Sequence, residues 1–144
     1  MFLLLRTYNW FDKALQSAFA EAGWPSLTGL QSMVMVNIAA GVTRPSNIAK
    51  NMGVSPQNMN HLLQELKRKD LITLVSDSAD LRAKHVIYTE RARDMRIIAK
   101  KMMMKQEQII IDEVGEKAYQ DFLFVFDKIE HFEDQSTGSA KSNR

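Results

Sequence analysis

Apolar residues recur at helical spacing in the N-terminal part of the chain. One stripe follows intervals of four and three residues, through Leu4, Tyr8, Phe11, Leu15, Ala18 and Ala22. This spacing predicts an amphipathic helix that ends near Gly23 and Pro25. Thr28 with Gln31 then forms a capping-box pattern, and a mostly apolar run follows as far as Ala40. We therefore expect a second helix that lies centrally in the core.

The next segment predicts two short helices joined by a tight Gly-Val-Ser turn. Thr43 is a candidate cap for the first helix, which closes at Gly53. Ser55 is a good N-cap for the second, and Pro56 suits its first position, where no amide hydrogen is missed. The apolar stripe of that second helix consists of Met59, Leu62, Leu63 and Leu66. A short connection that contains glycine is typical of a helix-turn-helix.

Two short runs, LITLV and HVIYT, are rich in β-branched residues and predict a β-hairpin. Nine residues, all polar or small except Leu81, separate them, whereas most hairpin loops need only about two to five. A long loop with a basic tip directly after a helix-turn-helix is typical of the wing of a winged-helix domain. Beyond it, Thr89 is a candidate cap for a long helix that runs to about Val114, and a last helix starts near Glu116.

The predicted fold class is therefore mainly α, with about six helices and a β-hairpin wing. We expect residues 1–134 to form one structural unit, in which residues 27–89 are the winged helix-turn-helix lobe. Residues 1–24 and 90–134 form long terminal helices. From residue 135 to residue 144 the chain is polar, small and glycine-containing, and we expect a disordered tail.

Charge is distributed unevenly along the chain, although the net charge is only +2. Residues 43–105 hold 13 basic and 6 acidic side chains, and residues 106–144 hold 4 basic and 9 acidic ones. A basic middle beside an acidic end favours one surface that binds a polyanion. Solvated helix faces are charged in any case, so this count alone supports both interpretations equally.

Composition excludes several classes of protein. The chain has no cysteine, which rules out disulfides, thiolate metal sites and cysteine-based redox sensing. The start MFLLLR is apolar for only four residues after its methionine, too short for a secretory signal. No run approaches the roughly 18 apolar residues that a membrane span requires. We expect a cytoplasmic domain that is not associated with a membrane.

The chemistry of the second short helix fits DNA. Glutamine and asparagine side chains carry a donor and an acceptor together, which matches the adenine edge in the major groove. In the wing, Arg82 is the candidate for insertion into the minor groove, with Lys84 near the phosphates, while Asp77 and Asp80 shape the loop. The residues expected to contact DNA are Thr43, Arg44, Ser55, Gln57, Asn58, Asn60, His61, Gln64, Arg82 and Lys84.

The chain closely resembles the MarR (multiple antibiotic resistance regulator) family of winged-helix repressors in three segments. These are LTGLQSMVMVNIA, RPSNIAKNMGVSPQNMNHLLQELKRKDLI and, most specifically, DSADLRAKHVIYTERA. The last looks like the wing signature of the family, an Asp-x-Arg before a strand that ends in Leu-Thr, here Tyr88-Thr89. The resemblance covers nearly the whole chain, to about Phe132.

The resemblance implies a homodimer in which the first and the last two helices interlock while the wings contact a palindromic operator on double-stranded DNA. It also implies a small-molecule effector, often phenolic or lipophilic, that relieves repression. The residues expected at the dimer interface are Leu4, Tyr8, Phe11, Ile110, Phe122, Val125 and Ile129.

Three positions depart from the family pattern. Asp70 replaces the glycine that commonly follows the recognition helix, so a left-handed turn there has to use aspartate. Leu81 stands where a second basic residue is frequent in the wing, and His61 stands where arginine is frequent. These changes predict a lower affinity for DNA. The contact made by His61 is expected to be weaker or sensitive to pH.

Other functions find less support. There is no nucleophile–base pair at a known spacing and no glycine-rich phosphate loop, so we expect no enzyme activity and no catalytic residues. His61, His85 and His131 lie far apart in sequence, and we expect neither a metal site nor a cofactor. Two alternatives stay open: a winged-helix module for protein interactions with weak or no DNA binding, and a metal-responsive regulator of the same family. Most methionines are expected in the core or the dimer interface. The methionines of KKMMMKQ, with Met33 and Met35, are nevertheless candidates for an adaptable ligand pocket.

Overall fold

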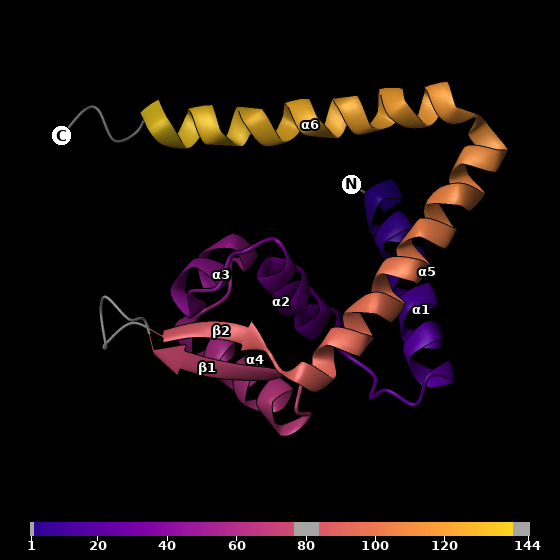
Figure 1. The fold of residues 1–144 in the computed structure, drawn as a ribbon. Helices are drawn as coiled ribbons and strands as arrows, with labels where there is room; N and C mark the ends of the chain where they lie inside the picture. Colours follow the sequence, from indigo (N-terminus) through magenta and orange to yellow (C-terminus); the bar gives the residue numbers. More distant parts are fainter. Residues whose placement is uncertain (1, 77–83, 140–144) are drawn as a thin grey trace. The chain divides into compact units, whose positions relative to one another are not determined.

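The computed structural model describes residues 2–76 and 84–139, with side chains described as far as residue 129 in the last helix. The chain divides into two compact units, Met1–Met103 and Met104–Arg144. Figure 1 shows the order of the elements along the chain. The predicted fold class is confirmed in the described residues, with six helices and one hairpin.

The first unit contains four helices, the hairpin and the first part of a fifth helix. The helices are α1 (Phe2–Glu21), α2 (Gly29–Ala39), α3 (Pro45–Met52) and α4 (Pro56–Arg68). The strands β1 (Ile72–Ser76) and β2 (Lys84–Tyr88) follow, and α5 (Glu90–Val114) leads into the second unit.

The helix starts follow local capping chemistry, with one correction. Thr28 and Gln31 make the full predicted capping box at the start of α2, and the Ser55 hydroxyl accepts from the amide of Asn58 at the start of α4. The prediction that Thr43 caps α3 is wrong, because the N-cap is Arg44 and no side chain bonds the first turn. The Thr43 hydroxyl lies instead 2.7 Å from Nδ1 of His85 on β2.

The turn after α4 confirms the prediction made for Asp70. Its φ is 55°, in the left-handed region that costs a side chain free energy and that aspartate tolerates better than most residues. The amides of Asp70 and Leu71 donate to the carbonyls of Lys67 and Leu66, so the last carbonyls of α4 have partners. The turn delivers the chain into β1.

The hairpin is antiparallel and has a regular register from Ile72 opposite Tyr88 to Ser76 opposite Lys84. A further hydrogen bond joins β2 to the α2–α3 loop, where the Val86 amide donates to the Thr43 carbonyl at 2.8 Å. The hairpin is therefore joined to the helix-turn-helix at two places: β1 follows the turn after α4, and β2 is bonded to the loop before α3.

One core holds the first unit together. It consists of the apolar stripe of α4, the inner face of α2, Phe19 of α1, Ile48 and Ala49 of α3, the base of the hairpin and the start of α5. Ile48, Leu66, Leu71, Val34, Val86 and Ala92 are fully buried in it. The apolar stripe predicted for α4 is thus the side of that helix that faces the core, and its opposite side is exposed.

The second unit consists of the end of α5 and α6 (Glu116–Ser139), with Gly115 between them at a φ of 83°. Tyr119 is buried, and its hydroxyl donates to the Glu107 carboxylate at 2.9 Å. The helix includes residues 135–139, which the sequence had placed in a disordered tail. In the described part of the chain, no helix is both long and apolar enough to cross a membrane.

Candidate nucleic-acid interface

The exposed side of α4 carries the amide side chains that the sequence proposed for base contacts. Gln57, Asn60, His61 and Gln64 follow one another at intervals of three, one and three residues, which places them on one face of the helix. All four are exposed, while the four apolar residues of the same helix are buried. Asn58 is also exposed, but its position in the helical turn places it beside this face.

Two basic residues that the sequence analysis missed extend the same face. Lys67 and Arg68 line a shallow depression together with His61 and Gln64. The signal was present in the spacing, since positions 67 and 68 lie three and four residues after Gln64. The face therefore changes from amides at the start of the helix to positive charge at its end.

A polar network holds α4 against α2. The side chain of Gln31 is 2% exposed; its amide nitrogen donates to the Glu65 carboxylate at 2.8 Å and its oxygen accepts from Lys69 at 2.7 Å. Lys69 also donates to the carbonyl of Ser26 at 2.7 Å. Because buried polar groups are costly to leave unpaired, this network defines where α4 sits on the core.

The outer oxygen of Glu65 faces the exposed side of α4. It lies 3.3 Å from Nε2 of His61 and 3.7 Å from the Arg68 guanidinium. Glu65 therefore connects the buried network to two side chains of the candidate interface, and it neutralises part of the Arg68 charge.

The remaining candidates divide into three groups. The hydroxyls of Thr43 and Ser55 are engaged within the chain, with His85 and with the first turn of α4. Arg44 and Lys84 are exposed, at the start of α3 and of β2. Asp77, Asp80 and Arg82, with Leu81, lie outside the described residues. Among the residues that are described, no three His, Asp or Glu side chains come together as a metal site would require.

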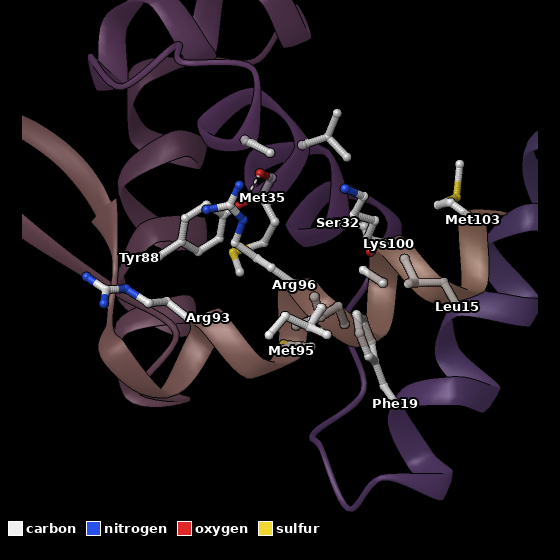
Figure 2. A pocket seen from close by; sticks show the side chains of 15 residues that line it. Leu15, Phe19, Ser32, Met35, Tyr88, Arg93, Met95, Arg96, Lys100 and Met103 are labelled. Atoms are coloured by element: carbon white, nitrogen blue, oxygen red, sulfur yellow. Dashed lines mark hydrogen bonds between the residues drawn. The ribbon is translucent and has the colours of Figure 1, made fainter.

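The first unit also contains a cleft of about 510 Å³, which the sequence did not predict as a site. Figure 2 shows side chains from α1, α2, β2 and α5 around it. Of the methionines considered for a ligand pocket, Met35 and Met103 line this cleft and Met33 does not. The residues of the cleft are Leu15, Phe19, Leu27, Ser32, Met35, Val36, Ala39, Tyr88, Arg93, Met95, Arg96, Ile97, Ala99, Lys100 and Met103.

Tyr88 links this cleft to the hairpin. It is the last residue of β2, and its hydroxyl donates to the Met35 carbonyl in α2 (Figure 2). Burial raises the pKa of Tyr88, and the nearby charge of Arg96 offsets part of that rise. The hydroxyl is therefore protonated at neutral pH and can act as the donor of this bond.

Comparison with known proteins identifies the architecture. No protein family model matches the chain, and no curated protein matches its sequence. Solved structures do match over most of its length. The transcriptional regulator PA4135 has a TM-score of 0.70 at 18% identity, covering 90% of this chain and 94% of that one. A MarR-family regulator from Rhodococcus sp. RHA1 has a TM-score of 0.66 at 22% identity, covering 89% of both chains.

The repressor CouR from Rhodococcus jostii RHA1 matches in two states. One structure contains p-coumaroyl-CoA and has a TM-score of 0.67 at 22% identity; the other contains a 23-mer DNA duplex and has a TM-score of 0.68 at 20% identity. Each covers 89% of this chain and of CouR. The chain has the MarR fold. In terms of that fold, α3 and α4 are the helix-turn-helix, α4 occupies the position of the recognition helix, and β1 and β2 form the base of the wing.

Proposed function

We propose that the chain is a homodimeric, sequence-specific DNA-binding transcriptional regulator of the MarR type, acting as a repressor that a small molecule relieves. The observation that carries the proposal is the exposed face of α4, where amide side chains and then basic ones stand on a helix whose opposite side is buried. A recognition helix needs this combination, because base edges are read by amide and basic side chains while the helix is held rigidly from behind.

Two structural neighbours support DNA as the partner. CouR has been solved with a DNA duplex, and a mutant of MepR from S. aureus has been solved with an oligodeoxyribonucleotide. In this chain, the two recognition helices of a dimer would enter adjacent major grooves about 34 Å apart on a palindromic operator. The site of action would be the nucleoid of a prokaryotic cytoplasm.

Exposed apolar residues support the homodimer. In α1, Phe2 and Leu3 are more than 70% exposed, and Leu4 is 53% exposed. In α6, Phe122, Val125 and Ile129 are about half exposed. Apolar surface of this extent is typical of an interface, and a second copy of the chain would cover it with a self-complementary face.

The cleft in the first unit supports the effector. A volume of about 510 Å³ falls within the range of roughly 300–1,000 Å³ that is typical of small-molecule sites. CouR, with the same fold, has been solved with p-coumaroyl-CoA. A ligand that binds one arrangement of the dimer better than another would shift the population between DNA-binding and non-binding states.

Salt dependence of DNA binding tests the proposal. We expect the protein to bind a duplex from the region upstream of its own gene. Its affinity should fall by a factor of about 10³ to 10⁵ between 50 and 200 mM salt, as for six to ten phosphate contacts. Fluorescence anisotropy of the labelled duplex measures this. If neither this duplex nor any fragment selected from genomic DNA binds at 50 mM salt, the regulator proposal is wrong and the alternative of a winged-helix module for protein interactions is favoured.

The same assay tests the metal-responsive alternative. Asp77 and Asp80 lie outside the described residues, and they are the carboxylates that could join His85 near the wing. A regulator without a metal requirement should have the same DNA affinity with and without a chelator. A change in affinity that added zinc restores would favour the metal-responsive form.

A further inference from the structure

A single carboxylate lies within the helix-turn-helix. Among residues 45–69, which include α3 and α4, Glu65 is the only acidic side chain. The basic side chains of the same stretch are Lys50, Lys67, Arg68 and Lys69. A carboxylate on a surface that binds a polyanion is repelled by the phosphates and lowers the affinity. The contacts of Glu65 show what this charge does on α4.

The two carboxylate oxygens of Glu65 have different surroundings. Oε2 accepts from the amide nitrogen of Gln31 at 2.8 Å, and Gln31 is only 2% exposed. Oε1 lies on the outer side, 3.3 Å from Nε2 of His61 and 3.7 Å from Nη2 of Arg68. The side chain of Glu65 is 30% exposed, against 63% for His61 and 71% for Arg68. The carboxylate is thus held from the core, and it holds two exposed side chains in turn.

This arrangement acts differently on the two kinds of contact that a protein makes with DNA. Phosphate contacts carry no sequence information and need only an accessible positive charge. A guanidinium beside a carboxylate offers less net charge to phosphates, so its phosphate contacts are weakened on any duplex. Base contacts need a defined orientation, and a side chain that is already held in place loses less conformational entropy on binding.

We infer that Glu65 is a positioning residue that determines the specificity of DNA binding through Arg68 and His61. It weakens their binding to phosphates of any sequence and favours their binding to base edges in the major groove. The inference deepens the proposed function and rests on it. Glu65 lowers the total affinity for DNA but raises the ratio of operator to non-operator affinity, and this ratio governs where a regulator is found on a genome.

Glu65→Gln tests the inference in the full-length protein. The glutamine removes the charge and keeps an oxygen that can accept from Gln31, so α4 should stay in place. Fluorescence anisotropy measures binding to an operator selected from genomic DNA and to an unrelated duplex of the same length. On the unrelated duplex at 50 mM salt, the affinity should rise about fivefold or more, and the slope of log affinity against log salt should steepen by about 0.9, as for one further phosphate contact.

The operator complex should respond in the opposite sense. Arg68 and His61 lose their fixed orientation in Glu65→Gln, so the operator affinity should not rise. The ratio of operator to non-operator affinity should therefore fall about fivefold or more. A role of Glu65 in packing alone would lower both affinities and would not steepen the salt slope.

Glu90→Gln is the matched control. Glu90 also pairs with an arginine three residues later, Arg93 at 2.8 Å, and its replacement changes the net charge by the same amount. It lies in the first turn of α5 and not on α4. Glu90→Gln should leave both the affinity ratio and the salt slope as they are in the wild type.

Arg68→Gln tests the same inference without altering Glu65. Arg68 should contribute little to binding of the unrelated duplex, so the variant should keep that affinity and its salt slope. On the operator it should lose about fivefold or more, as for one base contact. An equal loss on both duplexes would mean that Arg68 binds phosphates in spite of Glu65, and the inference would be wrong even if Glu65→Gln did not fold.

The inference is also overturned if folded Glu65→Gln keeps the wild-type ratio or salt slope, or if Glu90→Gln changes them equally. Circular dichroism verifies the folding of each variant. These outcomes leave the proposed function intact as long as the wild type prefers its operator. A wild-type protein that binds no selected duplex refutes the proposed function, and the inference with it.

Discussion

Asp70 has a left-handed backbone conformation, which costs free energy in any residue that has a Cβ atom. Its φ of 55° lies in the left-handed region, where a Cβ atom crowds the following carbonyl. Glycine has no Cβ and adopts this conformation freely. The position joins α4 to β1, where the amides of Asp70 and Leu71 donate to the last carbonyls of the helix.

Two substitutions at this position should separate the backbone effect from the side chain. Both Asp70→Gly and Asp70→Ala lose the weak contact to Arg91 at 3.9 Å. Only the alanine variant keeps a Cβ in the left-handed region, so it should be about 1 kcal/mol less stable than the glycine variant. Urea denaturation measures the difference, and equal stabilities would show that the turn is not left-handed in solution.

Gln31 and Gln64 illustrate two roles of the same side chain. Gln31 is buried and pairs with Glu65 and Lys69, whereas Gln64 is exposed on the recognition helix. Gln31→Ala should therefore lower the free energy of unfolding by about 2 kcal/mol, because it removes the hydrogen bonds of a buried side chain to Glu65, to Lys69 and to the Thr28 amide. Gln64→Ala should change stability by less than about 0.5 kcal/mol.

Gln64→Ala, which should hardly change stability, should have a clear effect on DNA binding. Loss of one base contact costs about 1–3 kcal/mol, so Gln64→Ala should weaken binding to a selected operator about tenfold or more. Binding to an unrelated duplex should be unaffected. A variant that weakens both equally would place Gln64 on the phosphates, and one that weakens neither would place it outside the interface.

Local interactions were predictable from the sequence, and distant ones were not. The capping box of Thr28 and the turn at Asp70 depend on neighbours within a few residues, and both were predicted. Thr43 was misassigned because its partner, His85, lies 42 positions away. Gln31 was recognised only as part of a capping box, since nothing in the spacing indicates that its amide also reaches Glu65.

At the scale of elements, the connection between β2 and α2 depends on Tyr88. Its hydroxyl donates to the Met35 carbonyl, and burial raises its pKa above the ordinary value for tyrosine. A group with a raised pKa in the folded state contributes stability that is fully present below its unfolded pKa of about 10 and is lost as the pH rises through the folded pKa.

Tyr88→Phe should therefore have an effect that depends on pH. Below pH 9 the variant should be about 1 kcal/mol less stable than the wild type, since it lacks one hydrogen bond. Above pH 10 the difference should shrink, because ionisation of Tyr88 in the unfolded wild-type chain favours unfolding. Urea denaturation at pH 8 and pH 10.5 checks this. Tyr8 and Tyr119, whose pKa values are also raised, are common to both proteins; a difference that stays constant would exclude a titrating Tyr88.

The elements themselves were predicted with close boundaries because their apolar periodicity is strong. The cleft was not, because its lining comes from four elements that span positions 15 to 103. Each contributes residues that, taken alone, fit an ordinary core. Only the arrangement of α1, α2, β2 and α5 shows that they surround an opening.

At the scale of the whole molecule, the exposed apolar residues of α6 predict that the monomer is not the stable form. Phe122 and Ile129 lie seven residues apart, two turns along one side of the helix. Replacing both by glutamate should raise the dissociation constant of the dimer by about 100-fold or more, because it places charge in an apolar interface.

Sedimentation velocity over a range of protein concentrations measures this change. Lys117→Glu is the control, since it adds negative charge to α6 on a different side of the helix and should leave the dimer intact. If the double variant remains as dimeric as the wild type, these side chains do not form the interface.

The hydrogen bond from the Val86 amide to the Thr43 carbonyl has a consequence beyond holding the wing in place. A two-stranded sheet has open edges, and an open edge is a template on which another chain can add a strand and begin to aggregate. The α2–α3 loop covers the middle of the outer edge of β2, where Val86 would otherwise present its amide to solvent. A hydrogen bond that joins the hairpin to the α2–α3 loop thus also protects the hairpin from pairing with foreign strands.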